Sequence, residues 1–176
     1  MKTIGRLFLF LLLGAPAIWA FPPTTEDATK PTPRIRVIFS DPEKFTDVKD
    51  SYMGTDKGRD AILAQLKDYI RQRASLYLAD GQKLAITVTD VDLAGDFEPT
   101  RGTNWEDVRI IREIYPPRVN LSFQVTDADG KVVKEGTRRL VDLAFEMNVP
   151  INNTDPLRYE KTLLDDWLRA DIAAKH

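Results

Sequence analysis

The stretch RVNLSFQVT at residues 118–126, followed by the turn DADG at 127–130, decides the fold of this chain. Apolar side chains occupy every second position of the stretch, which predicts a strand with one face buried and the other in water. The glycine-ended turn predicts a hairpin. We therefore expect residues 131–143 to return as the antiparallel partner strand, with a kink at Gly136.

Two further strands are predicted upstream, at residues 34–39 and 83–93. In the second, the apolar residues up to Val88 share one face, whereas Val91 lies in the opposite phase. Either a bulge lies near Thr89 and the acid after it, or the acids of this strand point toward the core. We favour the bulge, because a buried unpaired carboxylate is costly.

Two helices complete the pattern. Residues 57–78 place apolar side chains three and four positions apart, which predicts an amphipathic helix. A second helix is expected to open at Asp155-Pro156, with the acid as its cap and the proline in its first turn. Between them we expect a long loop at residues 94–107 and another strand at 108–115. The order predicts an α+β two-layer sandwich, with a mostly antiparallel sheet of about five strands and two helices on one face.

The N-terminus has the pattern of a secretory signal peptide. Residues 1–20 join a positive head to an apolar run too short for a stable membrane span, followed by small residues suited to cleavage after Ala20 or Ala17. Residues 21–33 are proline-rich and predict a flexible segment, and residues 34–174 predict a single α+β domain. We therefore expect a periplasmic protein with no stable membrane anchor once the leader is removed.

Composition excludes several classes of chemistry. The chain has 176 residues, a net charge of −2 and no cysteine, so it lacks both a basic surface for nucleic acid and a thiolate nucleophile. The single histidine, His176, is the last residue, which argues against a histidine-based catalytic triad or zinc site. Nothing in the sequence implies a cofactor. The missing cysteine and the terminal position of the only histidine favour a protein that is not an enzyme.

The densest acidic segment contains Asp90, Asp92, Asp96 and Glu98. Alternate carboxylates before a glycine turn resemble part of a calcium loop, although two ligand positions of that pattern are occupied by residues that cannot serve. The alternative is a strand end whose acids bond loop amides or pair with nearby arginines. The same acids could also supply a general acid and a general base for glycoside hydrolysis.

Trp105 and several arginines are further candidates. Arg109 and Arg118, with three arginines on neighbouring strands, could form an anion clamp, or they could pair with acids across the strands. Trp105 lies in a polar loop, where an aromatic side chain either contacts a partner or folds back onto the sheet edge. The uncharged outward face of residues 118–126 is a possible docking surface for a partner strand.

Five ordered motifs resemble a proteobacterial family known only as domain of unknown function 3016. They are FSDPEKFTD at 39–47, VTDVDLAG at 88–95, DVR at 107–109, YPPR at 115–118 and YEKTLLDDW at 159–167. The resemblance implies an exported bacterial protein. It brings no established activity, so no catalytic residue follows from it.

Three functions remain open at this point. The leading hypothesis is a non-enzymatic periplasmic binding or accessory domain that acts with an envelope protein partner. The first alternative is a divalent-cation or small-ligand binder that uses the segment from Asp90 to Glu98. The second alternative is a carboxylate-dependent hydrolase of the envelope.

Overall fold

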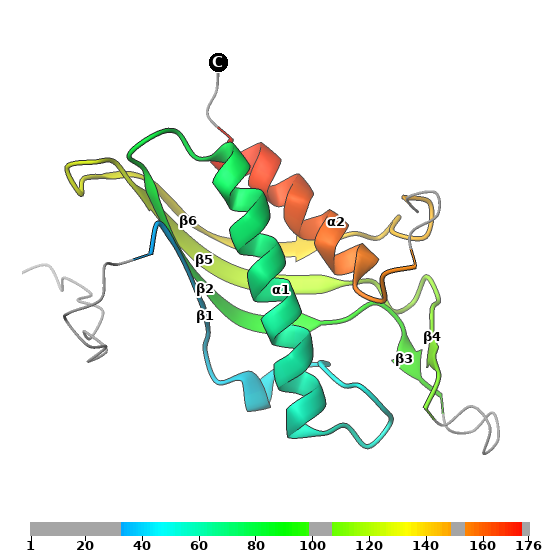
Figure 1. Ribbon diagram of the computed structural model, residues 1–176. Coiled ribbons are helices and arrows are strands. Elements are labelled where there is room, and N and C mark those ends of the chain that lie inside the picture. Colours follow the sequence, from blue (N-terminus) through cyan, green and yellow to red (C-terminus); the bar gives the residue numbers. More distant parts are fainter. Residues whose placement is uncertain (1–32, 99–106, 149–153, 174–176) are drawn as a thin grey trace, which may run out of the picture. The chain divides into compact units, whose positions relative to one another are not determined.

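The computed structural model describes residues 33–98, 107–148 and 154–173. The helices and strands of these described residues belong to the unit that begins at Pro33 (Figure 1). The predicted signal peptide at residues 1–20, the segment that follows it up to residue 32, and Trp105 lie outside the described residues. Within the described ranges, none of the helices combines the length and the apolar character of a membrane span.

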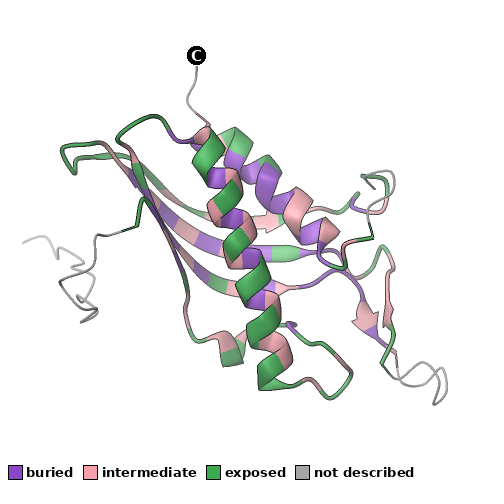
Figure 2. Ribbon diagram, in the orientation of Figure 1, coloured by how far each residue is buried: buried purple, intermediate pink, exposed green. Residues whose placement is uncertain are grey.

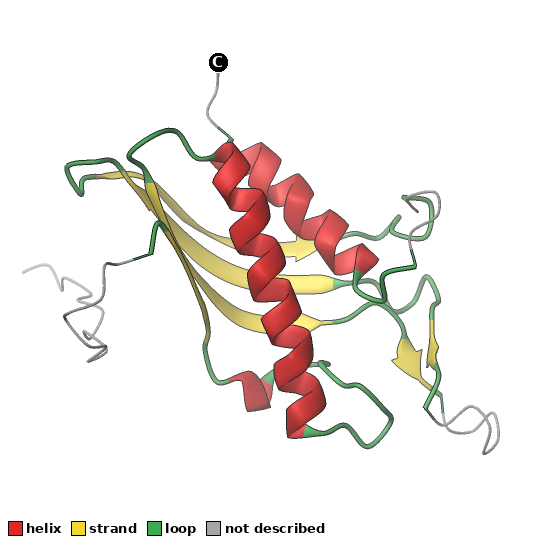
Figure 3. Cartoon of the chain, viewed as in Figure 1, coloured by secondary structure: helices red, strands yellow, loops and turns green. Residues whose placement is uncertain are grey.

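A four-stranded sheet forms one layer, in the order β1-β2-β5-β6 (Figure 3). Its strands are β1 (Ile35–Phe39), β2 (Lys83–Asp92), β5 (Arg118–Thr126) and β6 (Val132–Val141). The neighbours pair antiparallel except for β1 and β2, which run parallel. A parallel pair needs a crossover connection, and helix α1 (Asp56–Tyr77) provides it.

Helix α2 (Arg158–Trp167), continued by one π-helical turn η4 (Leu168–Ile172), lies beside α1 on the same face of the sheet (Figure 1). The core lies between these layers, and Figure 2 shows the buried residues on the inner sides of both helices and on the central strands. Trp167 packs edge-to-face on Phe123 of β5, with ring centroids 5.5 Å apart. The predicted α+β two-layer arrangement with a mostly antiparallel sheet is confirmed.

The predicted bulge is present in β2. The register against β5 shifts between Val88 and Asp90, so Thr89 is the extra residue. Val88 and Val91 therefore both face the core, and each is 1% exposed. The bulge turns the carboxylate of Asp90 outward, where it accepts hydrogen bonds from Thr46.

Two expectations about the connection after β2 are wrong. The segment expected to be a loop contains β3 (Asp96–Phe97), and the strand expected at 108–115 is reduced to β4 (Arg109–Ile110). These strands pair with each other in a separate two-stranded sheet, so the main sheet has four strands rather than about five. The cause is Gly95, whose φ of +78° turns the chain out of β2, and a Cβ atom there would lie 2.6 Å from a backbone oxygen of β4.

Two smaller predictions are also corrected. Helix α2 begins at Arg158, because the carboxylate of Asp155 accepts a bond from the Leu157 amide and closes a turn before the helix. The irregularity in the hairpin lies at the start of β6, where the register shifts between Val125 and Thr126, and not at Gly136. Gly136 instead leaves room for the guanidinium of Arg138 and the ring of Phe123, which would lie 2.8 and 3.3 Å from a Cβ atom there.

Candidate functional site

A pocket of about 280 Å³ opens where the end of β2, the β3–β4 sheet and the first turn of α2 meet the N-terminal half of α1. Its apolar walls come from Ile62 of α1, Leu93 after β2, Phe97 of β3 and Leu157 before α2. Each wall comes from a different segment of the chain, so the pocket exists only in the folded protein. Concave sites with apolar walls and a few polar groups are the usual binding sites for small molecules.

Glu160, in the first turn of α2, lines this pocket and is only 1% exposed. Its Oε1 accepts a hydrogen bond of 2.6 Å from the Ala94 amide. Its Oε2 is buried and has no hydrogen-bond partner among the described residues. Burial raises the pKa of this carboxyl, while the Ala94 amide and the charges of Arg109 and Arg158 oppose the rise. The pocket therefore contains a carboxyl group with unused capacity for hydrogen bonding.

Arg109 of β4 fixes the geometry of the pocket by binding two other segments of the chain, residues 47–49 and Gly95. Its Nη1 donates to Asp47 Oδ2 at 2.7 Å and to the Gly95 carbonyl at 2.8 Å, and its Nη2 donates to the Lys49 carbonyl at 3.1 Å. Its guanidinium lies 4.6 Å from the centre of the Phe97 ring. Because these contacts are all to the chain itself, we assign Arg109 a positioning role.

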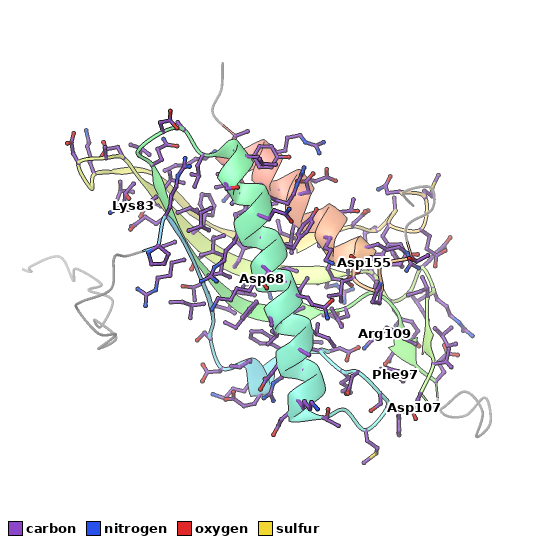
Figure 4. All side chains as sticks on the ribbon, in the orientation of Figure 1. Asp68, Lys83, Phe97, Asp107, Arg109 and Asp155 are labelled. Carbon is purple, nitrogen blue, oxygen red and sulfur yellow. The ribbon has the colours of Figure 1, made fainter. Side chains whose placement is uncertain are left out.

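Phe97 and Arg109 lie in the two-stranded sheet, and Asp107 lies next to it, toward the loop that precedes α1 (Figure 4). Asp107 and Asp50 add acidic groups to the pocket lining. Asp107 Oδ1 accepts a long bond of 3.4 Å from the Tyr52 amide. The carboxylate of Asp50 accepts bonds of 3.0 Å from the amide and from the hydroxyl of the α1 N-cap residue, Thr55. Both acids therefore hold the loop that precedes α1.

Lys49 is the second cation of the pocket lining. In the part of the chain that the structure describes, its ammonium forms no ion pair. Arg109, in contrast, is paired with Asp47, whose side chain is 10% exposed. Lys49 is thus the cation whose charge is not already matched by a bonded carboxylate.

The predicted acidic segment does not converge on one point. Asp90 bonds the amide and hydroxyl of Thr46 at 2.7 and 2.9 Å, and Asp96 accepts a bond of 2.7 Å from the Phe97 amide. Asp92 forms an ion pair of 2.9 Å with Arg118, and its pKa is raised by burial although Arg118 opposes the rise. The acids of this strand end therefore bond loop amides or pair with arginines, as in the alternative described above.

Glu98 pairs with Arg112 at 3.0 Å. No group of three or more potential metal ligands among His, Cys, Asp and Glu was found within residues 33–98, 107–148 and 154–173. Arg138 likewise has its own acid, because it binds Asp171 of the last helical turn with bonds of 2.7 and 3.0 Å. Arg118 therefore pairs across the strands, with its register partner Asp92, whereas Arg138 pairs with an acid outside the sheet.

Of the predicted site residues, Arg109 lines the pocket, whereas the acids from Asp90 to Glu98 and Arg118 lie elsewhere. Trp105 lies outside the described residues. The sequence reasoning missed Glu160, although a signal was present. Glu160 comes three residues after Leu157 and four before Leu164, so it occupies the buried stripe of α2.

Comparison with known proteins identifies one family to which the chain is similar. The family model described as "Protein of unknown function (DUF3016)" matches residues 33–170. No curated protein and no solved structure matches the chain.

Proposed function

The chain belongs to the family of proteins of unknown function DUF3016, and from this premise we propose that it is an exported, non-enzymatic domain that binds a small ligand. The observation that carries the proposal is the buried carboxyl of Glu160, whose Oε2 has no partner among the described residues although Glu160 lines a pocket. Buried polar atoms are nearly always bonded, and an unbonded one costs about 1–3 kcal/mol. A ligand that donates a hydrogen bond there recovers part of that cost.

The size and lining of the pocket support a small ligand. A volume of about 280 Å³ lies at the lower end of the range for small-molecule sites, roughly 300–1,000 Å³. Leu93, Ala94 and Leu157, which line it, are 3–4% exposed and are packed within the fold. These apolar walls are therefore held by packing, which favours binding without a large rearrangement.

The chemistry of the lining supports binding rather than catalysis. Hydrolysis by paired carboxylates needs two such groups placed on either side of the scissile bond. Here Asp50 is committed to the N-terminus of α1, and Asp47 to Arg109. Asp47 Oδ1 and Glu160 Oε2 are both buried and without a hydrogen-bond partner among the described residues, but only Glu160 of these two lines the pocket. One group of this kind is sufficient for binding.

The test is a titration of the isotope-labelled protein with a set of small neutral, anionic and cationic molecules, followed by NMR. We expect at least one to shift the amide signals of residues 93–97 and 157–160. An Ile62→Trp variant, which fills the pocket, should abolish these shifts. A Leu76→Trp variant is the matched control, because Leu76 lies on the same helix and is 67% exposed. If no class of molecule shifts these signals, the proposal is wrong.

Export is the second part of the proposal, and the leader-like pattern of residues 1–20 supports it. Fusion of this segment to a reporter that is active only in the periplasm should give activity. The mass of the secreted product should correspond to cleavage after Ala20 or Ala17. A fusion that is made but shows no reporter activity would contradict export.

An accessory role with an envelope protein partner is the second candidate function. Exposed apolar side chains on and after β6 favour it: Val133 is 49% exposed, Leu143 is 74% exposed and Met147 is 88% exposed. Among the described residues β6 ends the sheet order, so an extended segment of a partner could add to it. A photocrosslinking residue at position 133 should capture one envelope protein in cells, and one at the distant Lys67 of α1 should not.

A further inference from the structure

The identity of the ligand can be narrowed from the groups that line the pocket. Of the two oxygens of Glu160, Oε1 already accepts the Ala94 amide, and Oε2 is unbonded. An ionised carboxylate accepts hydrogen bonds and cannot donate them. The complementary group on a ligand is therefore a hydrogen-bond donor, and a charged donor gains most because the surroundings of Glu160 are apolar and buried.

We propose that the pocket binds a small primary ammonium compound with a short apolar chain, with its N–H groups directed at Glu160 and its chain against Leu93, Phe97 and Leu157. This inference rests on the proposed function as a small-ligand binding domain and names the ligand class of the same pocket. The short chain follows from the pocket volume of about 280 Å³ and from its apolar walls.

The charges of the lining support a cation. The pocket is lined by two cationic side chains, Lys49 and Arg109, and by three acids, Asp50, Asp107 and Glu160. Arg109 is already neutralised by an acid outside this set, through a bond of 2.7 Å. The remaining balance is one cation against three acids, so an anionic ligand would be repelled, whereas a cationic ligand would be attracted.

The hydrogen-bond geometry selects among cations. A guanidinium binds best through two parallel bonds to both carboxylate oxygens, and Glu160 offers only one free oxygen. A quaternary ammonium has no N–H group and is bound through aromatic faces. The ring of Phe97 already has the guanidinium of Arg109 against it. A primary ammonium needs neither two free carboxylate oxygens nor a free aromatic face.

The test uses n-butylammonium as the probe, with calorimetry for affinity and NMR for location. Matched probes are n-butanol, butyrate and butyltrimethylammonium. We expect n-butylammonium to bind at least tenfold more tightly than each of these. The signal of the Ala94 amide should move on binding, because that amide donates to the same carboxyl group.

Two variants locate the effect at Glu160. E160Q keeps an oxygen for the Ala94 amide and removes the charge, so it should weaken n-butylammonium binding at least tenfold. E43Q changes an exposed glutamate and should leave the affinity unchanged. The NMR spectrum of each variant verifies that the fold is intact.

The outcomes separate the two proposals. If n-butanol or butyrate binds at the pocket as tightly as n-butylammonium, or if E160Q binds it as well as the natural sequence, the ammonium inference is overturned while the binding function stands. If none of the probes binds, and the wider set of small molecules also leaves residues 93–97 and 157–160 unshifted, both proposals are wrong.

Discussion

Replacing Glu160 with glutamine should stabilise the protein at neutral pH and leave its stability in mild acid nearly unchanged. Burial raises the pKa of Glu160 above its ordinary value of 4.5, so the folded state binds its proton more tightly than the unfolded state does. Between the ordinary and the raised pKa, the natural protein must therefore lose stability as the pH rises. Glutamine has no proton to lose, and its amide oxygen can still accept the Ala94 N–H.

The magnitude follows from linkage. Each unit by which the folded pKa exceeds 4.5 lowers the free energy of unfolding by about 1.4 kcal/mol once the pH is above both values. Below pH 4.5 both states carry the protonated acid, and the penalty is absent. The stability difference between E160Q and the natural protein should thus grow with pH and level off above the raised pKa.

Urea denaturation at about pH 4 and about pH 7.5 measures this difference, with the linear extrapolation giving each free energy of unfolding. E43Q is the control, because that glutamate is exposed. A stability difference that is the same at both pH values would show that Glu160 is not a buried group with a raised pKa. A variant that is less stable at neutral pH would show that Oε2 of the carboxylate is also bonded in the folded protein.

Three further predictions concern the contacts around the pocket and between the two helices. Arg109→Ala should lower the free energy of unfolding by about 3 kcal/mol in urea, because it leaves a buried carboxylate unpaired, whereas Arg59→Ala, whose partners are exposed, should leave the midpoint unchanged. Gly95→Ala should lower the free energy of unfolding by well over the roughly 1–2 kcal/mol expected from its backbone conformation, because its Cβ would lie 2.6 Å from a backbone oxygen. Gly130→Ala, whose Cβ would have no atom within 4 Å, should lower it only by about that amount, and equal losses of stability would refute the clash. Asp165→Asn should lower the melting temperature at neutral pH but not in strong acid, because arginine donors hold the pKa of this carboxyl below 3.8. Its contribution to stability is present above that value and disappears as the pH falls through the lowered pKa. A difference in melting temperature between the variant and the natural protein that is the same at every pH would contradict this.

The scaffold could be predicted because it depends on local periodicity. The alternation in β5, the turn at 127–130 and the spacing in α1 are each readable within a single segment. Even the bulge at Thr89 was predictable, because a phase change in the apolar pattern leaves only a bulge or buried acids as explanations. These local features are sufficient to predict the layer of strands and the layer of helices without knowledge of any long-range contact.

The pocket could not be predicted, because it depends on contacts between distant residues. Arg109 binds Asp47 and the Lys49 carbonyl, 62 and 60 residues away, and no local pattern indicates such bonds. The β3–β4 sheet has only two residues in each strand, too few for any period to be visible. Glu160 is different, since its place on the buried stripe of α2 was readable from the sequence.

The bonds of Arg109 join three segments, residues 47–49, Gly95 and its own strand β4, and this has a consequence for the order of events in folding. The sheet and its two helices require only their own registers and packing, whereas the pocket also requires that residues 47–49, Gly95 and β4 reach the same point. A chain in which these bonds open locally keeps its layers and loses its pocket. Ligand affinity would then report whether the pocket has formed, whereas circular dichroism of the same sample would report only whether the helices and the sheet have formed.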